Sequence, residues 1–292
     1  MNSTFWTNTI WYVLLGISAL IELVFTMFKT KRRRLTFAIY LTTVGITLYF
    51  ETLILIFFRA YAYYPMIIQK NSDPFNDILV GNLFSQFSVS ATALLVVILN
   101  LEYYWYFIFG GIYGIIEEVF IALGIYSHNW YRTWMTVVGF TILTWIVKKM
   151  YLKILQGIKT ITYCIYIYLG LFTLYVITLL WGLDLAGFMR FTTTLFNNSK
   201  VSRYGLYLVY YSLSSIFIML IYFLKPKLIY KSLIIFILYA ICYTGYKLNL
   251  IWIKEGWFLP VTTITIFWMY LSVFILDKLC GILDLSDTGK LG

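Results

Sequence analysis

The sequence predicts an all-α protein, a polytopic bundle of about nine transmembrane helices with no soluble domain. Hydrophobic residues make up 62% of the 292-residue chain and charged residues only 12%, and the mean hydropathy is +0.84. A soluble domain would carry about a quarter charged residues. The apolar residues also lie in runs of about 20, the length of a helix that crosses a bilayer. Both observations indicate that lipid surrounds most of the chain.

The apolar runs place the spans along a single integral membrane domain, residues 1–292. The first run has no basic residue before it and is too long for a signal peptide, so it predicts a membrane anchor. Residues 183–204 are too polar to cross a membrane and suit a short interfacial helix, and no internal repeat is visible. The spans are expected near residues 5–28, 35–62, 78–99, 103–126, 133–151, 160–182, 205–224, 228–246 and 257–277.

The distribution of Lys and Arg predicts the orientation. Of these residues, 14 fall in the loop after the first span and in alternate segments beyond it, and 8 fall on the opposite side. Cytoplasmic loops carry the greater positive charge, so the N-terminus is expected outside and the C-terminus in the cytoplasm. The net charge of +10 therefore reflects topology, and no nucleic-acid partner is expected. Anionic lipid headgroups are the expected partners of the first basic cluster, which comprises Lys29, Lys31, Arg32, Arg33 and Arg34.

Four glutamates fall at membrane depth. An ionisable side chain at a helix centre costs about 2.5–3.5 kcal/mol to insert, so such residues usually face protein or water. At about 1.5 Å per residue, Glu51 and Glu117 lie roughly 21–24 Å from the cytoplasmic end of their spans, whereas Glu22 lies roughly 9 Å from it and could meet the basic cluster. Equal depth would let Glu51 meet Glu117 and Glu118, provided that the second and fourth spans are neighbours.

The fourth span carries glycine and glutamate on one face. Gly110, Gly114, Glu117, Glu118 and Gly124 fall within an arc of about 120° at 100° per residue. The glycines predict close helix packing, because small residues let a neighbouring helix approach. The glutamates have two interpretations: they are hydrogen-bonded within the bundle, or they form a site for a cation, a proton or a polar headgroup.

Two further residues are candidates for binding. Arg59 lies eight residues after Glu51 on nearly the same face of the second span, where it would pair with a glutamate or, as we prefer, extend to the outer interface. His128, in the loop after the fourth span, is the only histidine, and an interfacial side chain is the simpler interpretation. One histidine and three scattered cysteines give no metal motif, so no metal, cofactor or catalytic residue is expected.

One segment resembles part of a known group of proteins. Residues 103–140 read YYWYFIFGGIYGIIEEVFIALGIYSHNWYRTWMTVVGF. This segment, about an eighth of the chain, is similar to one in uncharacterised multi-spanning membrane proteins of endospore-forming Firmicutes. The resemblance implies no particular activity, and we expect the inner membrane of a bacterial cell as the location. It rests on Glu117, Glu118, Gly124, Ile125, Trp130 and Trp134.

Paired glutamates also open the motif of the intramembrane prenyl-protein endopeptidases. That family needs two later histidine motifs, and a chain with one histidine lacks those ligands. Three hypotheses therefore stay open. The first is binding or transport of a small ion, proton or solute through an acidic intramembrane site. The second is a non-transporting scaffold or sensor subunit, and the third is a lipid-modifying enzyme that uses His128. Substrate and oligomeric state are not specified by the sequence.

Overall fold

The computed structural model describes residues 4–68, 75–192 and 199–281. Within these ranges nine helices are long and apolar enough to cross a membrane, which confirms the predicted helical bundle. The long helices are α1 (Ile10–Lys29), α2 (Arg33–Glu51), α3 (Phe75–Ile98), α4 (Tyr104–Ala122), α5 (Thr133–Leu155), α6 (Thr160–Tyr175), α8 (Ser199–Leu224), α9 (Leu228–Lys247) and α10 (Phe258–Cys280).

Shorter elements interrupt or extend the spans. Three are π-helical turns: η1 (Phe5–Thr9), η2 (Thr52–Phe57) and η3 (Val176–Leu180), which continue α1, α2 and α6. A fourth is the five-residue helix α7 (Trp181–Leu185). Four three-residue strands lie outside the spans: β1 (Tyr61–Tyr63), β2 (Tyr126–His128), β3 (Met189–Phe191) and β4 (Ile251–Ile253).

Two expectations about the spans need correction. The second span ends at Phe57 rather than at 62, because the chain turns at Arg59, whose φ of +48° is incompatible with a continuing helix. The segment 183–204 is not one interfacial helix. It contains the end of α7, then β3, and the start of α8 at Ser199, while residues 193–198 lie outside the described ranges.

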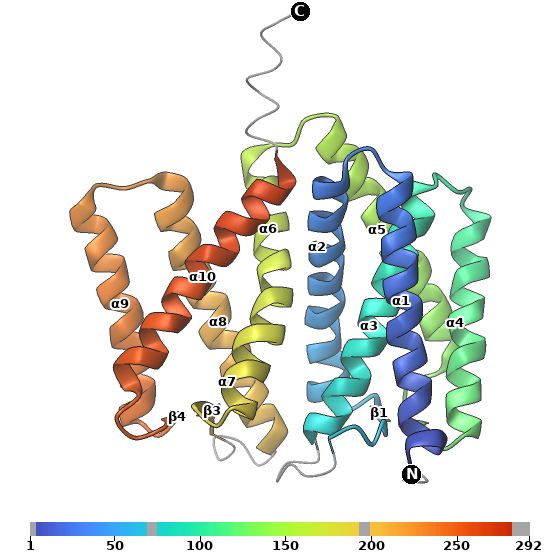
Figure 1. Cartoon of the computed structure of the whole chain (residues 1–292), viewed down its shortest axis with the longest axis horizontal. Coiled ribbons are helices and arrows are strands. Elements are labelled where there is room, and N and C mark those ends of the chain that lie inside the picture. Colours follow the sequence, from blue (N-terminus) through green and yellow to red (C-terminus); the bar gives the residue numbers. More distant parts are fainter. Residues whose placement is uncertain (1–3, 69–74, 193–198, 282–292) are drawn as a thin grey trace, which may run out of the picture. The chain divides into compact units, whose positions relative to one another are not determined.

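The chain divides into two compact units, Met1–Ile158 and Lys159–Gly292. In the first, α3 packs against α1, α2 and α5, and α4 packs mainly along α5 (Figure 1). Strands β1 and β2 pair antiparallel, with Tyr61 opposite His128 and Tyr63 opposite Tyr126. This strand pair lies at the end of the unit where α1 begins, since the Thr9 hydroxyl donates to the Pro65 carbonyl at 2.9 Å.

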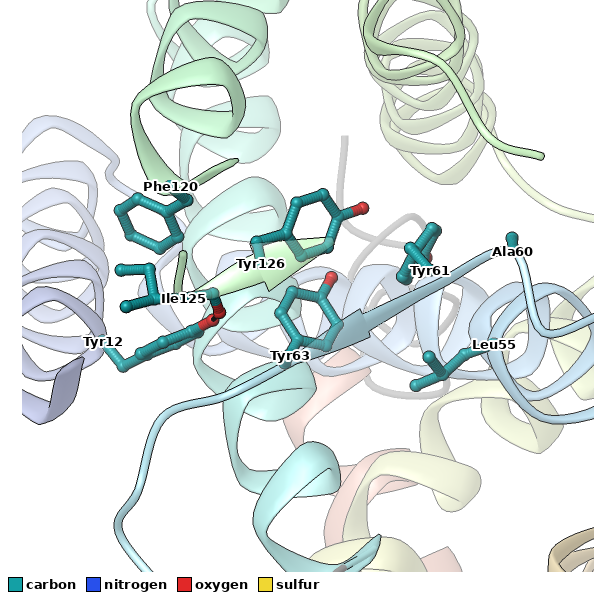
Figure 2. Close-up of a cluster of buried hydrophobic side chains, with 8 residues drawn as sticks. All are labelled: Tyr12, Leu55, Ala60, Tyr61, Tyr63, Phe120, Ile125 and Tyr126. Carbon is teal, nitrogen blue, oxygen red and sulfur yellow. Dashed lines mark hydrogen bonds between the residues drawn. The ribbon is translucent and has the colours of Figure 1, made fainter. Parts of the chain in front are cut away.

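A buried cluster fixes the strand pair to the helices (Figure 2). The hydroxyl of Tyr12, on α1, donates to the carbonyl of Ile125 at 2.6 Å, and the Tyr12 ring packs edge-on against Phe120 of α4. Figure 2 shows the rings of Tyr63 and Tyr126 side by side, and their centroids are 5.0 Å apart. The first and fourth helices thus hold two facing tyrosines in fixed positions.

The second unit repeats the order of elements of the first. From α2 onward the first unit runs α2, η2, β1, α3, α4, β2, α5, and the second runs α6, η3, α7, β3, α8, α9, β4, α10. The links between strands and helices also correspond. Tyr64 N–H donates to Ile125 C=O at 2.9 Å after β1, and Thr192 N–H donates to Leu250 C=O at 2.9 Å after β3.

Left-handed backbone positions recur at equivalent places in the two units. Gly124 (φ +71°) and Asn249 (φ +55°) each lie two residues before the strand that follows α4 or α9. Arg59 (φ +48°) and Gly187 (φ +72°) each lie two residues before β1 or β3. The two units thus share one order of four long helices, left-handed turns and a strand pair, here called the four-helix motif, with α1 added to the first. The sequence concealed this repeat because the matched positions carry different residue types.

Candidate intramembrane binding site

A cavity of about 260 Å³ lies among the helices and strands of the first unit. Its walls come from α2, α3, α4 and α5, and the paired strands contribute tyrosines at one end. Glu51 and Glu117 both line it, whereas Glu118 does not. The structure therefore places two of the three outer-half glutamates in one space, and α2 and α4 face that space from different sides.

Glu51 is the last residue of α2 and is held at the cavity by a tyrosine. Its side chain is buried, with the residue 6% exposed, and the Tyr61 hydroxyl donates to Oε2 at 2.5 Å. The π-helical turn η2 begins directly after it. Such turns are frequent at functional sites because they widen the helix and redirect side chains. Glu51 is therefore a buried acid with one strong donor and one face toward the cavity.

Glu117 has two partners. Its Oε1 lies 2.5 Å from Nε2 of His128, and their side chains are only 10% and 13% exposed. Its Oε2 accepts a hydrogen bond from the Thr136 hydroxyl of α5, which also lies 3.2 Å from the Tyr131 hydroxyl. Strand β2 thus brings His128 onto a glutamate, where its side chain is largely buried rather than solvated.

Tyrosine rings form the wall between the two carboxylates. The ring centroid of Tyr61 lies 4.9 Å from that of Tyr131 and 5.4 Å from that of Tyr126. All three, with Tyr63, line the cavity from segments outside the spans. Burial, and then the Glu51 carboxylate, raises the pKa of Tyr61 well above its ordinary value. Burial raises the pKa of Tyr131 to about 12. These hydroxyls stay protonated at neutral pH and act as neutral donors.

The hydroxyl of Tyr126 has no hydrogen-bond partner within the part of the chain that the structure describes. The residue is only 6% exposed and lines the cavity. In Figure 2 its hydroxyl points away from Phe120 and Ile125, which lie on the other side of the ring. The hydroxyl oxygen can therefore accept a hydrogen bond from a molecule bound in the cavity.

Beyond the acids and tyrosines the cavity is lined mainly by apolar residues, with Thr47, Ser85 and Gln86 among the polar exceptions, and it reaches the surface of the unit. Val89 of α3 and Phe140 and Leu143 of α5 line it beyond the tyrosines. Phe50 of α2 and Ile142 of α5 also line it, and each is 52% exposed. Because both belong to the spanning part of their helices, the cavity opens sideways at membrane depth between α2 and α5.

The other two glutamates lie apart from the cavity. Glu118 is exposed and accepts a hydrogen bond from the Thr133 hydroxyl, so the expectation that it shares a site with Glu51 is wrong. Glu22 accepts a hydrogen bond from the Thr92 hydroxyl of α3 at 2.5 Å instead of meeting the basic cluster. The Thr92 hydroxyl lies 2.7 Å from the hydroxyl of Tyr113, which lines the cavity. Glu22 is therefore linked to the cavity only through the hydrogen bonds of Thr92 and Tyr113.

The remaining candidates are Arg59 and the three glycines of the fourth span. Arg59 lies beyond the second span, exposed, and not on the helix face that carries Glu51. Gly110 and Gly114 face Val137 of α5, where an added Cβ would come within 3.3–3.4 Å of a side chain or 3.0 Å of backbone, as close packing requires. Gly124 does not pack against a helix: it is the left-handed turn after α4, with open space around it.

The second unit carries different residue types at the positions that match those of the cavity. Cys242 lies nine residues before β4, as Glu117 lies nine residues before β2, and Val261 takes the place of Thr136 as the fourth residue of its helix. By strand register the counterparts of Tyr61, Tyr63, Tyr126 and His128 are Met189, Phe191, Ile251 and Ile253. The second unit therefore forms the corresponding strand pair without counterparts of Glu117, the histidine or these tyrosines, which are a property of the first unit.

Across residues 4–68, 75–192 and 199–281, no three His, Cys, Asp or Glu side chains gather closely enough to hold a metal ion. Comparison with protein-family models, with curated proteins and with solved structures gives no match. The nine apolar helices within the described ranges place the protein among multi-pass membrane proteins.

Proposed function

We propose that this protein binds a small ion, proton or solute at Glu51 and Glu117 and transports it across the membrane. The observation that carries the proposal is that two carboxylates from different helices line one cavity at membrane depth. Acidic groups inside a membrane bundle are expensive and commonly mark ion, proton or substrate pathways. The second unit supports the functional interpretation over a purely structural one, because it builds the same motif with Cys242 in place of Glu117.

Transport is tested with purified protein in liposomes. Glu51→Gln and Glu117→Gln remove the charge and keep the shape, and we expect flux of protons or monovalent cations to fall about 10- to 100-fold, as loss of a charged partner does. Glu118→Gln is the matched control, since Glu118 lies next to Glu117 in sequence but outside the cavity. Unchanged flux in both cavity variants would contradict the proposal. Loss of folding in those variants, with no flux in the unmodified protein, would instead favour a scaffold.

We propose the bacterial inner membrane as the location, with the N-terminus outside. The strand end of the first unit, where Glu51 and Glu117 lie, then faces the exterior. On the opposite side the exposed Lys29 and Arg33 lie over the rings of Phe25 and Phe28, a placement suited to anionic headgroups. Labelling of single cysteines at Thr7 and Lys31 by an impermeant reagent in intact cells tests this: only the first should react.

A lipid-modifying enzyme is the second candidate. Two observations favour it: the His128–Glu117 contact of 2.5 Å is the arrangement of a general base with its orienting carboxylate, and the cavity opens at the side of the first unit, between α2 and α5. Mass spectrometry of lipids incubated with the protein, compared with His128→Gln, tests it. A changed lipid that depends on His128 would establish the enzyme, and an unchanged lipid pool would exclude it for the lipids supplied.

A further inference from the structure

The charged side chains of the cavity wall favour a ligand of positive charge. Among the described side chains that line the cavity there are two carboxylates, Glu51 and Glu117, and neither Lys nor Arg. Nε2 of His128 already occupies Glu117 at 2.5 Å, whereas Glu51 accepts a hydrogen bond from the Tyr61 hydroxyl and has no basic side chain against it on the cavity wall. Coulomb attraction is strong at such depth, so the wall favours one positive charge and disfavours anions.

The size of the cavity excludes a bare ion as the only occupant. A cavity of about 150 Å³ accommodates benzene. On that scale the volume of about 260 Å³ has room for a solute of roughly ten heavy atoms. The apolar stretch that includes Val89, Phe140 and Leu143 would remain poorly filled by a hydrated cation, whereas it suits a hydrocarbon or aryl group.

The tyrosine rings fit an ammonium group. A cation within about 6 Å of an aromatic ring centroid is attracted to the ring face. Tyr61, Tyr126 and Tyr131 stand close enough for one ammonium group to contact more than one ring, since the centroid of Tyr61 is 5.4 Å from that of Tyr126 and 4.9 Å from that of Tyr131. The unpartnered Tyr126 hydroxyl oxygen can accept a hydrogen bond, which an ammonium N–H supplies and a quaternary nitrogen does not.

We propose that the cavity of the first unit binds a protonated organic amine with an apolar body, the ammonium group lying between Glu51 and the tyrosine rings with one N–H on the Tyr126 oxygen. This inference rests on the proposed function and names its substrate class. The apolar body extends along α3 and α5 toward the opening between Phe50 and Ile142. An amphipathic amine would then enter from the lipid rather than through the strand end.

Binding to the purified full chain, measured by calorimetry in lipid nanodiscs, tests the proposal. The probes are 2-phenylethylamine, its N,N,N-trimethyl analogue, 2-phenylethanol and 3-phenylpropionate, which share a phenylethyl body and differ in the head group. We expect the amine to bind about tenfold or more tightly than the alcohol, and the carboxylate not to bind. Equal binding of amine and alcohol would overturn the assignment of a cation site.

Two variants assign the contacts. Tyr126→Phe should weaken binding of the amine about 3- to 10-fold and leave the trimethyl analogue unchanged, because only the amine donates to the hydroxyl. Glu51→Gln should weaken both cations, and Glu118→Gln neither. An equal effect of Tyr126→Phe on both cations, or none on either, would overturn the placement of the N–H.

The same proteins in liposomes separate this inference from the proposed function. Glutamate-dependent flux of protons or inorganic cations without amine binding would contradict the amine as the ligand and would support the proposed transport. Amine binding with the expected variant pattern but without any flux would support the ligand class and contradict transport. Neither binding nor flux would contradict both.

Discussion

Replacing Gly110 with alanine should disrupt the contact between α4 and α5 that brings Glu117 next to Thr136. A Cβ at Gly110 would lie 3.0 Å from the carbonyl oxygen and 3.3 Å from Cα of Val137. Both atoms belong to the backbone of α5, so the helix itself has to move. Overpacking of this kind costs about 1–3 kcal/mol.

Gly111→Ala provides the control, because a Cβ there meets nothing within 4 Å. Both substitutions gain the same helix propensity, about 1 kcal/mol. The difference in unfolding free energy between the two variants therefore isolates the packing cost, and we expect Gly110→Ala to be the less stable by about 1–3 kcal/mol. Reversible unfolding by dodecyl sulfate in mixed micelles, followed by circular dichroism, measures it. Equal stability of the two variants would refute the close contact of α4 with α5.

Three further predictions concern the strand end of the first unit. In a double-mutant cycle, Glu117→Gln and His128→Gln should show a coupling energy of about 0.5–3 kcal/mol in unfolding, and additivity would contradict their contact. Tyr12→Phe should lower the free energy of unfolding by about 1 kcal/mol, because the hydroxyl that donates to the Ile125 carbonyl is lost. No change in stability would argue against that hydrogen bond. Because the pKa of Tyr61 is raised in the folded protein, stability should fall as pH rises above about 10, where the unfolded tyrosine ionises first. Tyr61→Phe should flatten that decline, and tyrosinate absorbance at 295 nm follows the ionisation.

The spans were predictable from the sequence, and the strands and repeat were not. Lipid demands runs of about 20 apolar residues, which a sequence displays directly. Strands of three residues are too short to show an alternating pattern. The repeat is carried by backbone geometry, as in the left-handed turns at Gly124 and Asn249, and these positions have no residue type in common.

The candidate site was predictable in its acids but not in their partners. Glu51 and Glu117 stand out because a charge inside a membrane is costly. The sequence also gives their equal depth, but the rotation of α4 that turns Glu118 outward depends on how α5 packs. Tyr61 and Tyr126 gave no distinct signal among 27 tyrosines, since tyrosine at a span end ordinarily belongs to the interfacial belt. Pairing of two distant strands, which no local pattern reports, brings them and His128 to the acids.

The central claim is that Glu51 and Glu117 face one cavity. Its most direct test is a pair of cysteines at these positions, in a chain whose three native cysteines are replaced by serine, treated with a short bismaleimide. Intact-protein mass spectrometry distinguishes one reagent molecule joining both thiols from two that react singly. We predict a single bridging molecule for cysteines at 51 and 117, and two separate ones for cysteines at 51 and 118. Two separate adducts at 51 and 117 would contradict the shared site.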